Sequence, residues 1–142
     1  MYANFTVPKG KRTYKRVVDV PSMQSILNNS LDEYNNVGTK PMKLVLFLFA
    51  VEHICRVARV LLMPRGNALL VGVGGSGRQS VTRLAAYIGD MEVFQIEVSK
   101  SYTMVEWRED LKTVLRMAGV EGKPTVFLFA DTQARRHPVI MW

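Results

Sequence analysis

The chain has 142 residues, 48% of them hydrophobic and 22% charged, which is a globular composition and excludes a disordered chain. This length suits one domain and not two. A single cysteine, Cys55, excludes an intramolecular disulfide and fits a reducing compartment. No segment resembles a signal peptide, and the apolar run 44–51 is far shorter than the ~20 residues that span a bilayer. We therefore expect a cytoplasmic protein without membrane contact.

The net charge of +7 is concentrated near the start of the chain. Residues 1–16 contain no acid and carry the bases Lys9, Lys11, Arg12, Lys15 and Arg16. We interpret residues 1–20 as a basic, extended arm that ends in a short strand at 17–20. Such an arm could form a nucleic-acid patch, but a solvated connector is the favoured interpretation, so nucleic acid is not an expected partner.

Two helical patterns follow the arm. In the first, Ser22 is the expected N-cap and Gly38 the terminator, and one face carries the apolar residues Met23, Ile26, Leu27, Leu31 and Tyr34. The second pattern runs from Pro41 to about Leu62, and its apolar first half predicts a buried helix. His53 lies beside Cys55 without metal-ligand spacing, so both are interpreted as structural.

The stretch 68–88 predicts a strand, a glycine-rich turn and a helix. An apolar strand at 68–71 enters the turn, and the helix that leaves it runs to Ile88 and ends at Gly89. Glycines allow successive backbone N–H groups to turn toward one point, and the helix directs its positive dipole end to the same place. The pattern is therefore typical of a phosphate-binding loop, although a glycine-rich turn that binds nothing could have the same sequence pattern.

The match to the G-x-x-x-x-G-K-[ST] motif is incomplete at its last two positions, which contact the phosphates and the metal ion. Gly72 and Gly77 have the required separation, but Arg78 replaces the lysine and Gln79 replaces the serine or threonine. Arginine keeps the positive charge on a longer, planar group, whereas a glutamine amide is a weaker Mg²⁺ ligand than a hydroxyl in that place. We expect phosphate binding to persist and metal positioning to suffer.

The second half of the chain predicts two more strands with a helix between them. A strand at 93–96 precedes a T-x-x-E capping box, Thr103 with Glu106, and the helix that follows is expected to close at Gly119. Trp107 on this helix is interpreted as a core or interface anchor.

A continuous apolar strand at 125–131 ends in the acid Asp131. Alternating strands and helices imply right-handed crossovers and a parallel sheet, which would bring Asp131 to the same sheet edge as the glycine loop. A carboxylate there is placed for a Mg²⁺–phosphate group, although an acid that only turns the chain at a strand end would look alike. Thr132, which follows, cannot act as a general base.

Residues 21–133 resemble the front part of the fourth AAA+ module of a dynein heavy chain, of the ciliary, axonemal type and not the cytoplasmic one. Three stretches carry the resemblance: PRGNALLVGVGGSGRQS at 64–80, EWREDLK at 106–112 and VFLFADTQ at 126–133. The Arg-Gln pair in the glycine loop is itself typical of that module.

The resemblance implies a partial P-loop AAA+ domain, a three-layer α/β/α fold with a parallel sheet, preceded by helices. It implies a regulatory module that binds ATP or ADP with Mg²⁺, within a ring motor that moves along microtubules in the axoneme of cilia. Asp131 would hold the metal. The phosphates would be held by Gly72, Val73, Gly74, Gly75, Ser76, Gly77, Arg78, Gln79 and Ser80. The implied partners are other AAA+ modules of the heavy chain, the intermediate and light chains and, indirectly, microtubules.

The resemblance stops at Gln133, and residues 134–142 are interpreted as a tail outside the family pattern. Strands four and five of the AAA+ sheet and its helical lid have no counterpart, so we expect an incomplete module with little or no hydrolysis. Thr132 occupies the position of the usual glutamate, which also puts turnover in doubt. Two alternatives stay open: a non-enzymatic fragment that binds a partner through unpaired strand edges or the basic arm, and an active ATPase.

Overall fold

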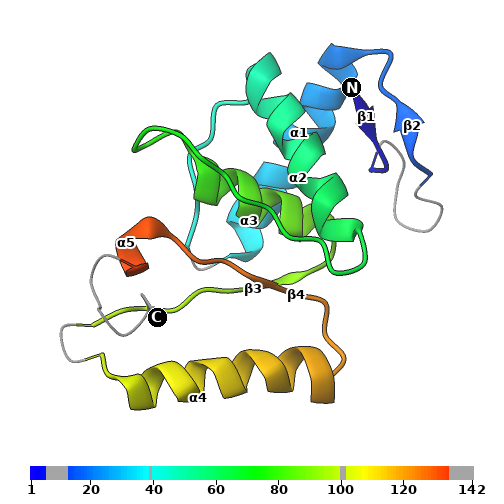
Figure 1. The fold of residues 1–142 in the computed structure, drawn as a ribbon. Helices are drawn as coiled ribbons and strands as arrows, with labels where there is room; N and C mark the ends of the chain where they lie inside the picture. Colours follow the sequence, from blue (N-terminus) through cyan, green and yellow to red (C-terminus); the bar gives the residue numbers. More distant parts are fainter. Residues whose placement is uncertain (6–12, 39, 100–101, 135–142) are drawn as a thin grey trace. The chain divides into compact units, whose positions relative to one another are not determined.

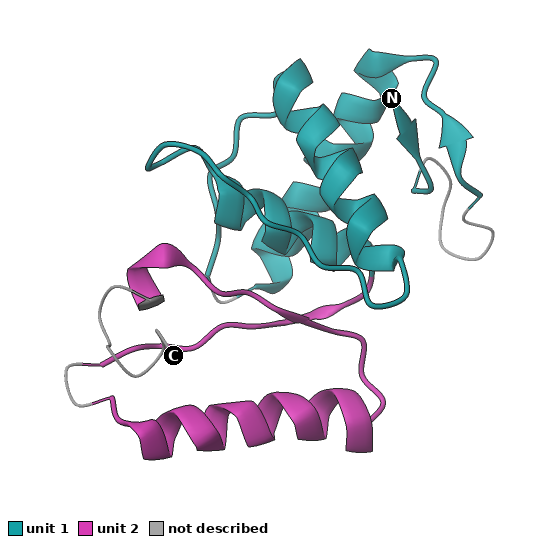
Figure 2. Cartoon of the chain, in the orientation of Figure 1, with its two compact units in different colours: residues 1–89 teal, residues 90–142 magenta. Residues whose placement is uncertain are grey.

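The computed structural model describes residues 1–5, 13–38, 40–99 and 102–134 (Figure 1). The chain forms two compact units, residues 1–89 and residues 90–142 (Figure 2). The described residues contain helices, a short antiparallel strand pair and a short parallel one, which agrees with the expected α/β class. The two units are taken in turn.

The first unit opens with a small antiparallel hairpin, which the sequence did not predict. Strand β1 (Tyr2–Ala3) pairs with β2 (Lys15–Arg16), and Ala3 lies opposite Lys15. The strand expected at 17–20 is wrong, because helix α1 already begins at Val20. Of the basic arm, Lys15 and Arg16 lie in β2, whereas Lys9, Lys11 and Arg12 lie outside the described residues.

Helix α1 (Val20–Val37) buries the predicted face. Met23, Leu27 and Leu31 are buried, and the C-cap Gly38 confirms the predicted end of the helix. The N-cap is Asp19 and not Ser22, and it makes no side-chain capping bond. Pro21 explains this shift, because proline has no N–H to donate and suits the first helical turn.

Helix α2 (Leu48–Leu62) begins later than predicted. The segment from Pro41 to Phe47 is not helical, since side chains of α1 bind its backbone. The Asn35 amide accepts from the Met42 N–H at 2.8 Å and donates to the Met42 carbonyl at 3.0 Å. Gln24 donates to the Leu46 carbonyl at 2.8 Å. These bonds replace helical ones, and they leave Val45 and Phe47 exposed instead of buried.

Helix α3 (Arg78–Ile88) packs against α2 and α1 and closes the core of the first unit. Its predicted end is confirmed, with Gly89 as the C-cap, whereas it starts at Arg78, ahead of the helical pattern that begins at Val81. Leu84 and Ala86 are completely buried on this helix. The fully buried centre of the unit comes from all three helices: Met23, Leu27, Val51, Ile54 and Leu84.

The second unit contains a parallel strand pair, β3 (Glu92–Phe94) and β4 (Thr125–Phe127). Val93 lies opposite Val126 and Phe94 opposite Phe127. Both strands are shorter than predicted, although the Leu128 N–H still donates to the Phe94 carbonyl at 2.8 Å. Parallel pairing of the second and third predicted strands agrees with a right-handed crossover unit of the α/β class.

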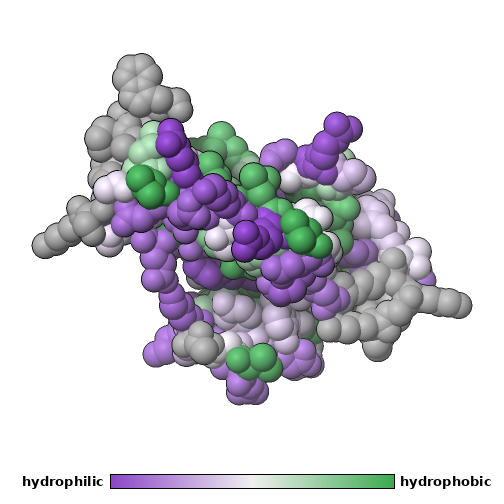
Figure 3. All heavy atoms as spheres, turned by 90° about the horizontal axis from the view of Figure 1, so that it is seen from below, coloured by the Kyte–Doolittle hydropathy of each residue, from purple (hydrophilic) through white to green (hydrophobic). Residues whose placement is uncertain are grey.

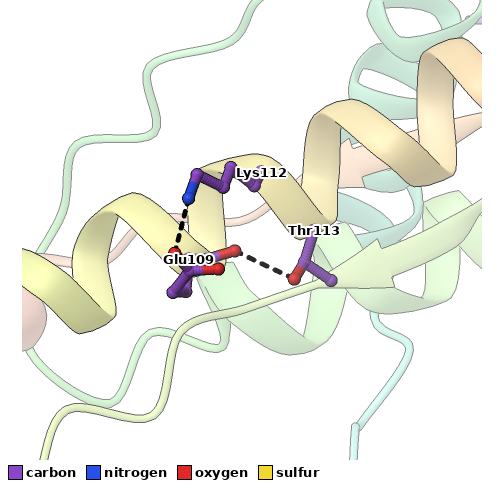
Figure 4. A network of polar contacts seen from close by, with 3 residues as sticks. All are labelled: Glu109, Lys112 and Thr113. Atoms are coloured by element: carbon purple, nitrogen blue, oxygen red, sulfur yellow. Dashed lines mark hydrogen bonds and ion pairs between the residues drawn. The ribbon is translucent and has the colours of Figure 1, made fainter.

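Helix α4 (Met104–Leu115) lies between these strands in sequence, and its capping box of Thr103 and Glu106 is confirmed. Glu109 links two later positions of the helix (Figure 4): its carboxylate pairs with Lys112 at 2.6 Å, and its carbonyl accepts from the Thr113 hydroxyl at 2.9 Å.

The predicted end of this helix at Gly119 is wrong. The helix continues as a π-turn, η1 (Arg116–Val120), that contains Gly119. Gly122 instead adopts the left-handed conformation, with φ of +63°, and the Lys123 N–H returns to the Met117 carbonyl at 3.0 Å. The wider π-turn carries the helix one residue further before a left-handed glycine can close it.

Trp107, predicted as a core or interface anchor, is half-buried and lies against aromatic residues in and after β4. Its ring lies 6.5 Å from Phe127 and 6.3 Å from Phe129, and Phe94 stacks on Phe127 at 6.2 Å. Residues 126–129 alternate: Val126 and Leu128 are buried, whereas Phe127 and Phe129 face the tryptophan and stay partly exposed. This is the period of two that a strand imposes.

Apolar side chains also reach the surface, where Figure 3 shows hydrophobic patches between hydrophilic ones. The most exposed large ones are Val18, Leu69, Val71 and Val120, each more than four-fifths accessible. Among the described residues, no helix is long and apolar enough to cross a membrane.

Candidate functional site

The glycine loop enters α3 through two left-handed glycines. Gly75 and Gly77 have φ of +77° and +72°, a left-handed conformation that residues with a Cβ rarely adopt. A turn bond from the Ser76 N–H to the Val73 carbonyl, 3.3 Å long, curls the loop, and Gly77 is the N-cap of α3. The sequence predicted this loop and helix correctly.

Gly72 marks the narrowest part of the loop. A Cβ at this position would come within 3.3 Å of the Ser76 hydroxyl and 3.6 Å of the Arg78 side chain. A larger residue would therefore require the Ser76 hydroxyl to shift slightly.

Arg78 is the first residue of α3 and folds back over the loop. Its guanidinium donates to the carbonyls of Leu70, at 3.5 Å, and Val73, at 3.2 Å. Within the first turn of the helix, the buried Thr82 hydroxyl donates a hydrogen bond to the Arg78 carbonyl at 2.9 Å. Gln79 is exposed and Ser80 is half-buried on the same turn.

The strand expected at 68–71 is absent. Among the described residues nothing pairs with it, and Leu69 and Val71 are 91% and 85% exposed. Leu70 between them packs against the core, so the side chains alternate as in a strand without the hydrogen-bonded neighbour that defines one. The apolar run predicted the side-chain pattern but not the pairing.

Asp131 begins the short helix α5 (Asp131–Ala134), four residues after β4, and its side chain is exposed. It belongs to the second unit, and the glycine loop belongs to the first. Thr132 beside it is also exposed, whereas Gln133 is buried.

Gln133 is a residue whose role the sequence analysis missed. Its amide oxygen accepts from the Ala130 N–H at 2.7 Å, and its amide nitrogen donates to the Ile96 carbonyl. A glutamine three residues after a helix cap is one half of a capping box, and that signal was present in the sequence. The cap itself is Ala130 and not serine or threonine, which hid the pattern.

The described residues offer no metal site that is built from protein side chains alone. In the part of the chain that the structure describes, no three His, Cys, Asp or Glu side chains gather. Mg²⁺ in phosphate sites needs only one or two protein carboxylates and takes its remaining ligands from phosphates and water. Asp131, which is exposed in the second unit, is one such carboxylate.

A hollow of about 160 Å³ lies elsewhere in the first unit. Its walls come from the hairpin and α2, and no residue of the glycine loop lines it: Met1, Tyr2, Tyr14, Glu52, Cys55, Arg56 and Arg59. Pockets for drug-sized ligands and cofactors usually exceed ~300 Å³, so this hollow is too small for a nucleotide.

A glycine loop that opens a helix, followed by a parallel strand pair with an acid after its second strand, defines an α/β protein of the P-loop class. The sequence profile of the family described as P-loop containing dynein motor region D4 matches residues 42–140. The match covers more than half of the chain, so the chain belongs to this dynein motor-region family.

Relatives among characterised proteins agree with this family. The chain is 46% identical over 136 residues to dynein axonemal heavy chain 1 of Homo sapiens, and 49% identical over 134 residues to the dynein-1-beta heavy chain of the flagellar inner arm I1 complex of Chlamydomonas reinhardtii. It is 45% identical over 130 residues to dynein axonemal heavy chain 3 of Mus musculus. These alignments cover 92–95% of this chain but only 3% of each relative.

Proposed function

We propose that the chain is a nucleotide-binding segment of the fourth AAA+ module of an axonemal dynein heavy chain. In this proposal it binds ATP or ADP with Mg²⁺ and has a regulatory role in the microtubule-based movement of cilia, so it belongs to the cytoskeleton of the axoneme. Its partners are the other AAA+ modules of a heavy chain, the intermediate and light chains and, through the motor, microtubules.

The observation that carries the proposal is the glycine loop. Its left-handed glycines, Gly75 and Gly77, turn the backbone into the N-terminus of α3, where N–H groups and the helix dipole favour an anion. Arg78 adds a positive charge at the base of the loop. The phosphate contacts are assigned to residues 72–80, and the Mg²⁺ contact to Asp131.

We further propose that this segment turns nucleotide over slowly or not at all. Thr132 is exposed next to Asp131 and cannot take a proton from water, since a hydroxyl is not a base near neutral pH. Removing one preorganised charge-stabilising group can cost ~10²–10³ in rate, and Arg78, Gln79 and Thr132 each depart from the active pattern.

Binding of a fluorescent ATP analogue to the folded 142-residue chain tests the proposal. We expect saturable binding that weakens at least ~10-fold in Gly77→Val, because a β-branched residue resists the left-handed conformation. A folded sample that binds nothing at millimolar nucleotide would refute the proposal. Phosphate release above background that Asp131→Ala abolishes would refute the second part alone.

A second candidate function is a non-enzymatic contact with another segment of a dynein heavy chain. The alternating apolar side chains of Leu69, Val71 and Val73 are 78–91% exposed, and the chain spans only 3% of the relatives that it matches. Exposed apolar surface of this kind favours association. Recovery as a monodisperse monomer at high concentration would speak against this second role.

A further inference from the structure

Gln133 joins the ends of both strands of the second unit. Only 6% of its surface is exposed, and it lies two residues after Asp131. Its backbone N–H donates to the Ala130 carbonyl at 2.9 Å, and its side-chain oxygen accepts from the Ala130 N–H at 2.7 Å. Together, these two bonds form a ring that closes the turn containing Asp131.

The other end of the same amide fixes that ring to the rest of the unit. The nitrogen of Gln133 donates to the carbonyl of Ile96, a buried residue two positions beyond β3. One side chain therefore satisfies a donor after β4 and an acceptor after β3. Buried polar groups of this kind are costly unless every hydrogen bond is made, and here each end of the amide has a partner.

The arrangement requires an amide. A glutamate could still accept from the Ala130 N–H, as in an ordinary capping box, but its second carboxylate oxygen would face the Ile96 carbonyl without a proton to donate. A methionine of similar length would make neither bond. Gln133 thus does more than cap a helix of one turn.

We infer that Gln133 is the positioning residue for Asp131, and that it holds the carboxylate where a nucleotide-bound Mg²⁺ needs it. The inference rests on the proposed function, in which Asp131 is the metal ligand. Mg²⁺ demands near-octahedral geometry with ligands at about 2.0–2.1 Å, so a carboxylate on a loosened turn is a poor ligand. Loss of a partner that orients a ligand typically costs ~10–100-fold in metal affinity.

The test compares binding of a fluorescent ATP analogue in excess Mg²⁺ with binding in EDTA. The variants are Gln133→Met, which removes both side-chain bonds, and Gln133→Glu, which removes only the bond to Ile96. Val126→Ala is the matched control, because Val126 is 8% exposed in β4 and its truncation loosens the same unit without touching the turn.

We expect Gln133→Met to lose at least ~10-fold of the Mg²⁺-dependent gain in affinity, with affinity in EDTA unchanged, and Gln133→Glu to fall between it and wild type. Val126→Ala should keep the gain. In the nucleotide-free chain, the Ala130 amide should exchange its hydrogen faster in Gln133→Met than in Val126→Ala.

Two results would overturn the inference: an unchanged Mg²⁺-dependent gain in Gln133→Met, or a loss that appears equally in EDTA and in Val126→Ala. A wild-type chain that binds the analogue in neither condition would instead refute the proposed function, and the inference with it. The two failures are therefore distinguishable.

Discussion

The guanidinium of Arg78 donates a hydrogen bond to the backbone carbonyl of Val73, 3.2 Å away, and so closes the loop that precedes its own helix. A weaker contact of 3.5 Å reaches the Leu70 carbonyl. Under the proposed function, a phosphate bound by Arg78 would share its guanidinium with these carbonyl oxygens.

Two substitutions of Arg78 distinguish the contribution of its charge to nucleotide binding from that of its shape. Arg78→Met should weaken binding of a fluorescent ATP analogue by ~10–100-fold, since a hydrogen bond to a charged group contributes ~1.5–3 kcal/mol. Arg78→Lys should bind within a few-fold of wild type, because lysine keeps the positive charge. Its single ammonium group cannot contact both loop carbonyls, so this variant shows what the charge alone contributes. Arg56→Met is the charge-matched control, as Arg56 pairs with Glu52 in an exposed contact of 3.1 Å on α2. Equal losses in Arg78→Met and Arg56→Met would contradict a specific role for Arg78.

The conformation of Gly77 predicts a cost in stability that can be measured without any ligand. With φ of +72°, an alanine at this position is strained by ~1–2 kcal/mol, so Gly77→Ala should lower the free energy of unfolding by that amount. Gly74→Ala offers a control in the same loop, because Gly74 has ordinary φ and open space around its Cα. Urea denaturation followed by circular dichroism measures both. Indistinguishable midpoints for the two variants would contradict the left-handed assignment.

Two threonines, one that caps α4 and one inside it, predict different effects of the same substitution. Thr103→Ala removes the N-cap side chain and should destabilise the helix by ~1 kcal/mol. Thr113→Ala removes a bond back to the Glu109 carbonyl within the helix and should be neutral or slightly stabilising, because alanine is the better helix former. Amide hydrogen exchange along 104–115 reports both. Faster exchange in Thr113→Ala than in Thr103→Ala would refute this account.

Local patterns predicted the elements that depend on local chemistry. The apolar face of α1, the end of α3 and the capping box of Thr103 follow from spacing and from cap residues alone. The start of α2 could not be predicted in this way. Pro41 suits a first turn, but Asn35 and Gln24 capture the backbone of 42–46 by bonds that no helical pattern reveals.

In the candidate site, too, the features that depend on local chemistry were predicted and those that depend on distant contacts were not. The glycine spacing predicted the loop, since left-handed residues and close approach are properties of glycine itself. The strand at 68–71 was not found, because a strand requires a paired neighbour and its side-chain alternation alone cannot supply one. The bond from Gln133 to Ile96 spans 37 residues, so only the pairing of β3 and β4 brings its ends together.

Cys55 predicts a loss of stability at high pH. Burial raises the pKa of this thiol from 9.0 to about 11; the Glu52 carboxylate adds to the shift, and the Met1 ammonium opposes it. Since the folded pKa lies above the unfolded one, the stabilisation is complete below pH 9 and is lost as the pH rises to about 11. The loss should reach about 2–3 kcal/mol in the free energy of unfolding. Burial and the Asp110 carboxylate also raise the pKa of Tyr102, so the measured quantity is the difference between wild type and Cys55→Ala in urea denaturation at each pH. A difference that stays constant from pH 8 to pH 11 would show that the Cys55 thiol ionises as readily in the folded chain as in the unfolded one.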